Sequence, residues 1–187
     1  MTATELLIIG ASLFAAALIQ GTVGFGFGLI GLGLLSLILP VAQATVVVAI
    51  PALLVNGVLL HRLRHALELG SLHYLLAAAC VATPLGVWLL DRVSEAALSA
   101  MLALVLLIAV AQPYLPGVSA KRWHGAWLGM PIGALAGLLA GTLGTAGPPL
   151  VAYINSQRFE PRRHVAAIQL CLGLTGGIRV IELTRQQ

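Results

Sequence analysis

Two glycine-rich stretches hold the residues with the clearest capacity for chemistry. The first contains Gly21, Gly24, Gly26, Gly28, Gly31 and Gly33, and the second contains Gly141, Gly144, Gly147, Pro148 and Pro149. In a helix interior glycine costs about 1 kcal/mol and proline about 3 kcal/mol, so both stretches are expected to interrupt helices. An interruption frees backbone N–H groups, and the positive end of the helix that resumes behind it favours an anion.

Polar side chains beside these stretches could add contacts to an anion. Thr22, Thr142 and Thr145 offer hydroxyl donors. Gln20 and Asn56 lie within apolar segments, where they could line the site or hydrogen-bond between helices. The predicted anion site consists of Gln20, Gly21, Thr22, Gly24, Gly26, Asn56, Gly141, Thr142, Gly144, Thr145, Gly147 and Pro148. Close packing between helices is the alternative explanation for the glycines, because small residues four positions apart allow it.

The elements that position these residues must lie in a lipid bilayer. The chain has 187 residues, of which 59% are hydrophobic and 9% are charged, and its mean hydropathy is +1.01. Soluble domains carry about 25% charged residues, so a soluble fold is nearly excluded. A spanning helix needs about 20 apolar residues, which leaves room for about six helices. We therefore predict an all-α polytopic membrane protein with a single transmembrane domain over residues 1–187.

Apolar segments and charged connectors alternate along the chain. The segments are Leu6–Gln20, Phe25–Leu39, Gln43–Leu60, Ser71–Leu90, Ala96–Ala111, Ala126–Ala140, Pro149–Ser156 and Val165–Leu183. The formal net charge is +4, and we attribute it to cytoplasmic loops rather than to a nucleic-acid partner. Three connectors, which hold Arg62 and Arg64, Lys121 and Arg122, and Arg158, Arg162 and Arg163, are predicted to be cytoplasmic. The N-terminus is then predicted to lie outside.

An internal repeat relates the two glycine-rich stretches. Gly21-Thr22-Val23-Gly24 matches Gly141-Thr142-Leu143-Gly144, with an offset of 141 − 21 = 120 residues. We predict a first repeat over about residues 1–112 and an incomplete second repeat over about 125–187. Five segments in the first repeat place the second in the opposite orientation. An inverted-topology repeat with glycine-broken or re-entrant helices is typical of many secondary transporters.

Other kinds of site find little support in the sequence. No carboxylate pair and no metal-binding motif falls in the apolar segments, so we expect no enzyme activity, no metal and no cofactor. Cys80 and Cys171 are interpreted as small core hydrophobes. Arg179 lies within the last segment, where a charge could bind an anion. Because Arg179 is also close to Glu182 and to the end of the chain, we expect its side chain to reach toward the membrane interface.

The motifs resemble those of a known family. Gly21-Thr22-Val23-Gly24-Phe25-Gly26 with Pro40, and Gly141 to Leu150 with Tyr153, resemble the sulfite exporter TauE/SafE family of membrane transporters. Asn56 also matches a family position. The resemblance implies a bacterial inner-membrane permease for small inorganic or organic anions, often sulfur-containing ones such as sulfite or organosulfonates.

Members of that family commonly have two full repeats. Because the second repeat is incomplete here, two further alternatives stay open beside a permease. One is an anion channel, and the other is a non-transporting subunit or fragment of a larger membrane assembly. A homo-oligomer could also complete the transport path.

Overall fold

The computed structural model describes residues 3–67, 70, 72–114, 126–157 and 159–185. Its helices are α1 (Ala3–Val23), α2 (Phe27–Leu35), α3 (Val41–Leu63), η1 (Arg64–Ala66), α4 (His73–Leu90), α5 (Glu95–Ala111), η2 (Gln112–Tyr114), η3 (Ala126–Leu128), α7 (Gly129–Leu143), α8 (Gly147–Ser156) and α9 (Pro161–Arg185). No strand occurs among these described residues. The predicted all-α fold is therefore confirmed. Part of the connector that holds Lys121 and Arg122 lies outside the described residues, as does Arg158.

Among the described residues, four helices have the length and apolarity needed to cross a membrane. They are α1, α3 with η1, α4 and α9, whereas α5 and α7 are shorter apolar helices. Large hydrophobic side chains also cover the outside of the bundle. Leu7, Leu37 and Val81 are 74%, 80% and 79% exposed, as expected for a surface whose solvent is lipid. The chain is thus a multi-pass membrane protein.

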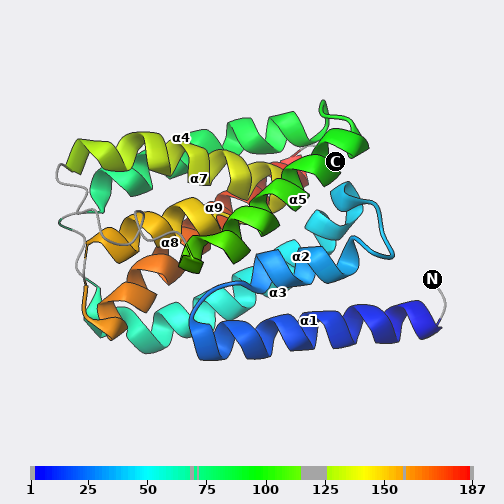
Figure 1. The fold of residues 1–187 in the computed structure, drawn as a ribbon, viewed down its shortest axis with the longest axis horizontal. Helices are drawn as coiled ribbons and strands as arrows, with labels where there is room; N and C mark the ends of the chain where they lie inside the picture. The colour runs from blue at the N-terminus through cyan, green and yellow to red at the C-terminus, as the bar shows by residue number, and fades with distance from the viewer. Residues whose placement is uncertain (1–2, 68–69, 71, 115–125, 158, 186–187) are drawn as a thin grey trace.

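Helix–break–helix units occur twice, with their boundaries 120 residues apart. α1 ends at Val23 and α2 begins at Phe27, while α7 ends at Leu143 and α8 begins at Gly147. The next helices, α3 and α9, begin at Val41 and Pro161. Figure 1 shows that α1 and α7 run in opposite directions along the bundle, and that α3 and α9 do so as well. The two three-helix units are therefore antiparallel to each other.

Glycines allow α4 and α7 to pack at very short range. A Cβ atom at Gly137 would lie 2.9 Å from the Cα atom of Ala79, and one at Gly141 would lie 2.6 Å from the Cα atom of Gly86. Neither distance is compatible with a real side chain. Gly137 and Gly141 therefore serve close helix packing, which was the alternative explanation for the glycine-rich stretches.

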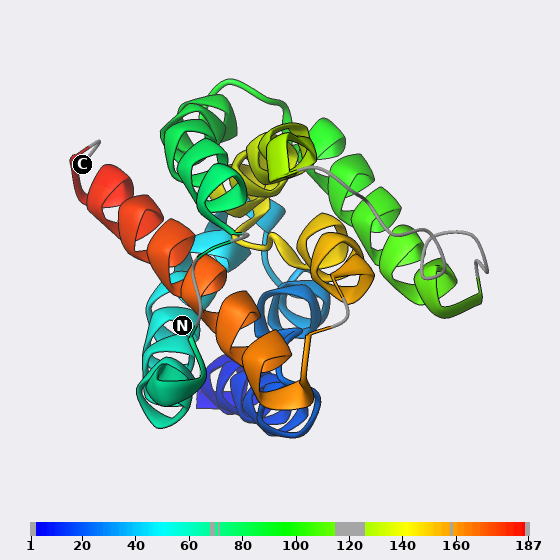
Figure 2. The same cartoon turned by 90° about the vertical axis from the view of Figure 1, so that its left-hand side faces the viewer.

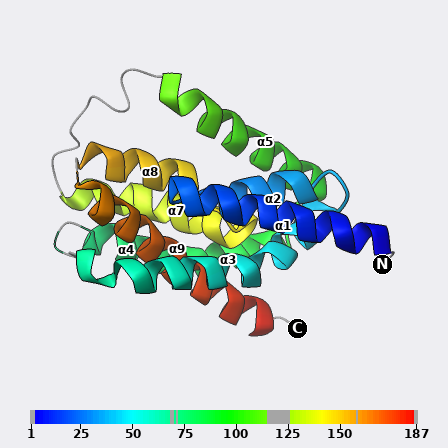
Figure 3. The ribbon, with the colours of Figure 1, turned by 90° about the horizontal axis from the view of Figure 1, so that it is seen from below.

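Helix α9 packs against helices of both units. Figure 2, which looks along the bundle, shows α9 crossing the other helices obliquely. It contacts α3, α4, α7 and α8. By contrast, α5 lies at the periphery in Figure 3, although its first residue, Glu95, accepts a hydrogen bond from the backbone N–H of Val41 at the start of α3. The position of α9 brings its polar side chains to both helix breaks.

Candidate functional site

The first break is formed by two glycines in left-handed backbone conformations. Gly24 has φ +87° and Gly26 has φ +110°, values that side chains other than glycine rarely adopt. Gln20, one turn before the break, bridges it with its side chain. Its Oε1 atom accepts a hydrogen bond from the backbone N–H of Phe27 at 3.0 Å. Gln20 thereby caps the N-terminus of α2, where backbone donors would otherwise lack partners.

A buried amide network ties this first break to α3 and α9. The Nε2 atom of Gln20 donates to Oδ1 of Asn56 at 2.5 Å and to Oε1 of Gln169 at 3.3 Å. Gln169 in turn donates from Nε2 to the carbonyl oxygen of Gly24 at 2.6 Å. These contacts show that Gln20 and Asn56 hydrogen-bond between helices, one of the two roles considered for them. The sequence analysis missed Gln169, whose only signal is its polarity within an apolar helix.

The second break follows α7 and is held by an arginine. Gly144 has φ +69°, and Arg179 on α9 donates from Nε to the carbonyl oxygen of Gly141 at 3.0 Å. Its Nη1 atom donates to the carbonyl oxygen of Thr45 on α3 at 3.0 Å. Arg179 is only 2% exposed. The expectation that this side chain reaches to the membrane interface is therefore wrong, because α9 carries it to the carbonyl groups at the end of α7.

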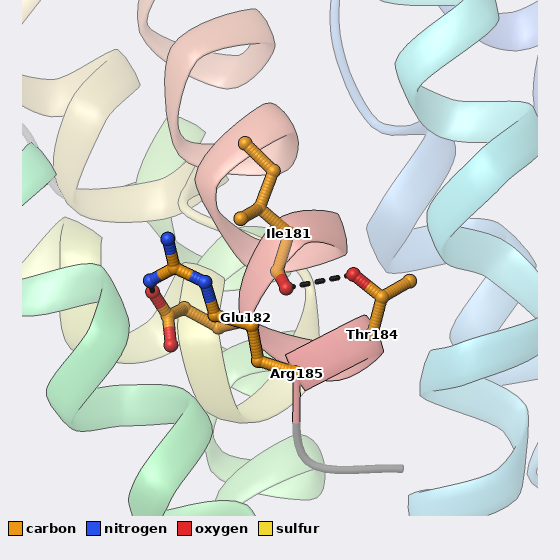
Figure 4. A network of polar contacts seen from close by, with 4 residues as sticks. All are labelled: Ile181, Glu182, Thr184 and Arg185. Atoms are coloured by element: carbon orange, nitrogen blue, oxygen red, sulfur yellow. Dashed lines mark hydrogen bonds and ion pairs between the residues drawn. The ribbon is translucent and has the colours of Figure 1, made fainter.

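The guanidinium of Arg179 keeps an unused donor and an unneutralised charge. Its Nη2 atom is buried without a hydrogen-bond partner. The acidic residue nearest to it in sequence, Glu182, pairs instead with Nη1 of Arg185 at 3.0 Å. The two side chains lie next to each other at the end of α9 in Figure 4. In the described part of the chain no carboxylate pairs with Arg179. A buried cation of this kind is costly unless an anion accompanies it.

The two breaks meet directly. A Cβ atom at Gly28, in the first turn of α2, would lie 2.8 Å from the carbonyl oxygen of Gly144 and 3.2 Å from Cβ of Thr145. Only glycine therefore permits this approach. A partly enclosed cavity of about 40 Å³ lies at the junction. The centre of one water molecule needs about 10–15 Å³ of free space. The cavity therefore has room for a few waters or for one small oxyanion in their place.

Both short helices begin at this cavity. Its lining comprises Gln20, Gly26, Phe27, Gly28, Ala49, Ala52, Asn56, Ala140, Gly144, Thr145, Ala146, Gly147, Leu172, Thr175, Gly176 and Arg179. Phe27 and Gly28 belong to the first turn of α2, and Ala146 and Gly147 to the N-terminal end of α8. The positive ends of two helix dipoles therefore point to the same place as Arg179.

Six of the twelve predicted site residues line the cavity. These are Gln20, Gly26, Asn56, Gly144, Thr145 and Gly147. Gly24, Gly141, Thr142 and Pro148 are buried beside it without lining it, and Gly21 and Thr22 are exposed. The hydroxyl groups of Thr22 and Thr142 donate to carbonyl groups of their own helices, those of Ile19 and Leu138. The prediction missed Gly28, Thr175 and Arg179 as lining residues.

The chain was also compared with known proteins. The model of the sulfite exporter TauE/SafE family matches residues 8–184. The chain belongs to this family. No curated protein and no solved structure matches it. The matched range contains both helix breaks, the cavity and all of α9 except its last residue, Arg185. Members of the TauE/SafE family are membrane transporters rather than enzymes, and membership implies a sulfur-containing anion such as sulfite as the substrate.

Proposed function

We propose that this TauE/SafE protein is a secondary transporter that moves small sulfur-containing anions, sulfite above all, by alternating access. The anion binds in the cavity between the two helix breaks. One observation carries the proposal: the N-terminal ends of α2 and α8 and the guanidinium of Arg179 converge on a single cavity. Each helix end carries about half a positive charge, so three positive groups from three helices surround the site.

Neutral polar groups complete the recognition of an oxyanion. Thr145 makes no side-chain hydrogen bond among the described residues, so its hydroxyl is available as a donor. Gln20 and Asn56 line the same cavity while holding the first break in place. Because Gln20 and Asn56 are fixed by their own hydrogen bonds, they need little reorganisation when an anion enters.

The paired units supply the means for alternating access. We assign the first unit to about residues 1–112 and the second to about residues 125–187, each with one break at the cavity. Helices α1 to α3 and α7 to α9 run in opposite directions (Figure 1). In transporters with inverted repeats, one repeat rocks against the other around a site near the bilayer midplane. Such rocking would open the cavity to each side of the membrane in turn.

The distribution of basic residues supports a bacterial inner-membrane location with the N-terminus outside. Arg62 lies in the last turn of α3 and Arg64 directly after that helix. The turn between α4 and α5 carries Asp91 beside Arg92, and Glu95 begins α5. Lys and Arg favour the cytoplasmic side. Single cysteines at positions 65 and 91, in a chain without its native cysteines, should react with impermeant reagents from the cytoplasmic and the outer side. Labelling of both from the same side would refute this orientation.

Flux measurements test the proposal as a whole. The purified chain is reconstituted into liposomes loaded with sulfite, and release is followed over a range of sulfite concentrations against protein-free liposomes. A carrier gives a rate that saturates with concentration. A rate that rises linearly without saturation would contradict alternating access, and the absence of protein-dependent release would contradict sulfite transport.

A further inference from the structure

The net charge of the cavity sets the charge of the anion that fits it. Among the described residues that line the cavity, Arg179 is the one charged side chain, and the others are amides, hydroxyls, glycines and apolar groups. Charged and titratable side chains do occur on the helices around it. They are Glu5, His61, Arg62, His73, Tyr74, Cys80, Tyr153, Arg162, Arg163, His164, Cys171, Glu182 and Arg185. None of these described groups belongs to the lining, so the site contributes a single positive side chain.

We propose that the cavity selects a singly charged oxyanion and takes sulfite as the hydrogen sulfite monoanion, HSO₃⁻, rather than as the dianion. This inference rests on the proposed transport of sulfite. Both protonation states exist near neutral pH, so the choice between them decides which species crosses the membrane.

Electrostatics in a buried site favours the monoanion. Arg179 is 2% exposed and has no carboxylate partner in the described part of the chain. Its guanidinium stays charged and is the one full positive charge among the described lining side chains, beside the partial charges of the two helix ends. The second charge of a dianion would be offset only by these partial charges, and Gln20 already takes the N–H of Phe27 at the start of α2. A buried charge that is not fully compensated costs several kcal/mol. The free Nη2 atom can place its N–H groups on the oxyanion, a charge-assisted contact for which arginine is well suited.

Thr175 favours a protonated anion for a separate reason. Its Oγ1 atom donates its only proton to the carbonyl oxygen of Cys171 at 2.8 Å. A hydroxyl whose proton is already used can act only as an acceptor. Thr175 lines the cavity, so it can accept the proton of hydrogen sulfite when that proton is on an oxygen. A dianion has no such proton, and its oxygens would meet the lone pairs of this hydroxyl.

The test compares three anions with the reconstituted wild-type protein. Sulfite is titrated at pH values below and above its second ionisation, methanesulfonate serves as a permanent monoanion, and sulfate serves as a permanent dianion. If only the monoanion binds, the apparent affinity for total sulfite falls about tenfold per pH unit once the dianion predominates. The affinity for methanesulfonate stays constant over the same pH range. Sulfate displaces sulfite only weakly.

Two variants locate the effect in the cavity. Arg179→Gln should abolish the binding of methanesulfonate. Arg185→Gln, on the exposed end of the same helix, should leave that binding unchanged. Thr175→Val should weaken hydrogen sulfite more than methanesulfonate, because methanesulfonate has no proton to donate. Equal weakening of both anions would contradict the acceptor role of Thr175.

Failure of this inference can be told apart from failure of the proposed function. A sulfite affinity that is constant or rises with pH, or sulfate binding as tight as methanesulfonate binding, would overturn the selection of a monoanion while sulfite transport stands. If neither sulfite nor methanesulfonate is bound or moved by the wild-type protein, both proposals fail.

Discussion

Replacing Gly144 by alanine should remove anion binding through a contact with Arg179. The residue has φ +69°, so an alanine there costs about 1–2 kcal/mol in backbone strain. In addition, its Cβ atom would collide with Nη1 of Arg179. The guanidinium must then move away from the cavity. A hydrogen bond to a charged group contributes about 1.5–3 kcal/mol, so loss of the contact between Arg179 and the anion should weaken binding roughly 10- to 150-fold.

Gly26 provides a matched control within the same cavity. It also has a positive φ, +110°, and it also lines the site. An alanine at Gly26 therefore suffers backbone strain at least as large. Its Cβ atom, however, would meet only the side chain of Ile30 at 3.7 Å, an ordinary van der Waals contact. Gly26→Ala should thus lower stability without displacing the guanidinium.

The assay measures methanesulfonate and sulfite affinity by calorimetry in detergent, after circular dichroism and size-exclusion chromatography have confirmed folding. We expect a large loss of affinity in Gly144→Ala and a small one in Gly26→Ala. Equal losses in the two variants would show that backbone strain at the breaks, and not the position of Arg179, controls binding. Retained affinity in Gly144→Ala would refute the assignment of the site.

Two further predictions concern the helices that support the site. Glu95→Gln should lower the free energy of unfolding by about 1 kcal/mol, because the side chain that caps the start of α3 at Val41 loses its charge. Transport should persist in this variant. Loss of transport without loss of thermal stability would contradict a purely structural role. Gly137→Val should prevent α4 and α7 from packing and remove the folded peak in size-exclusion chromatography, whereas Gly10→Val, with nothing within 4 Å, should be tolerated. A folded Gly137→Val protein would show that the close approach of α4 and α7 is dispensable.

The helix breaks could be predicted from the sequence because their cause is local. Glycines at positions 24 and 144 take left-handed conformations, and Pro148 directly follows the first residue of α8. These residues disfavour a continuous helix wherever the chain places them. The repeated Gly-Thr-apolar-Gly pattern likewise anticipated the offset of 120 residues between the two sets of helix boundaries.

The residues that bring the breaks together could not be recognised in the same way. Gln169 and Arg179 acquire their partners from Gly24, 145 residues earlier, and from Gly141, 38 residues earlier. No local pattern in α9 shows which of its faces meets these carbonyl groups. Arg179 was even expected at the interface, since Glu182 lies close to it in sequence, whereas the structure pairs Glu182 with Arg185 (Figure 4).

In the proposed alternating-access cycle, Arg179 would join substrate binding to the movement between the two units. Its Nη1 atom donates to Thr45 on α3, in the first unit, and its Nε atom donates to Gly141 on α7, in the second. Rocking of one unit against the other must strain or exchange one of these bonds. An anion on the same guanidinium changes the energy of that exchange, because a ligand shifts a conformational equilibrium by its differential affinity for the two states. Under this proposal, the side chain that binds the anion is also the contact through which the anion would alter access to the site.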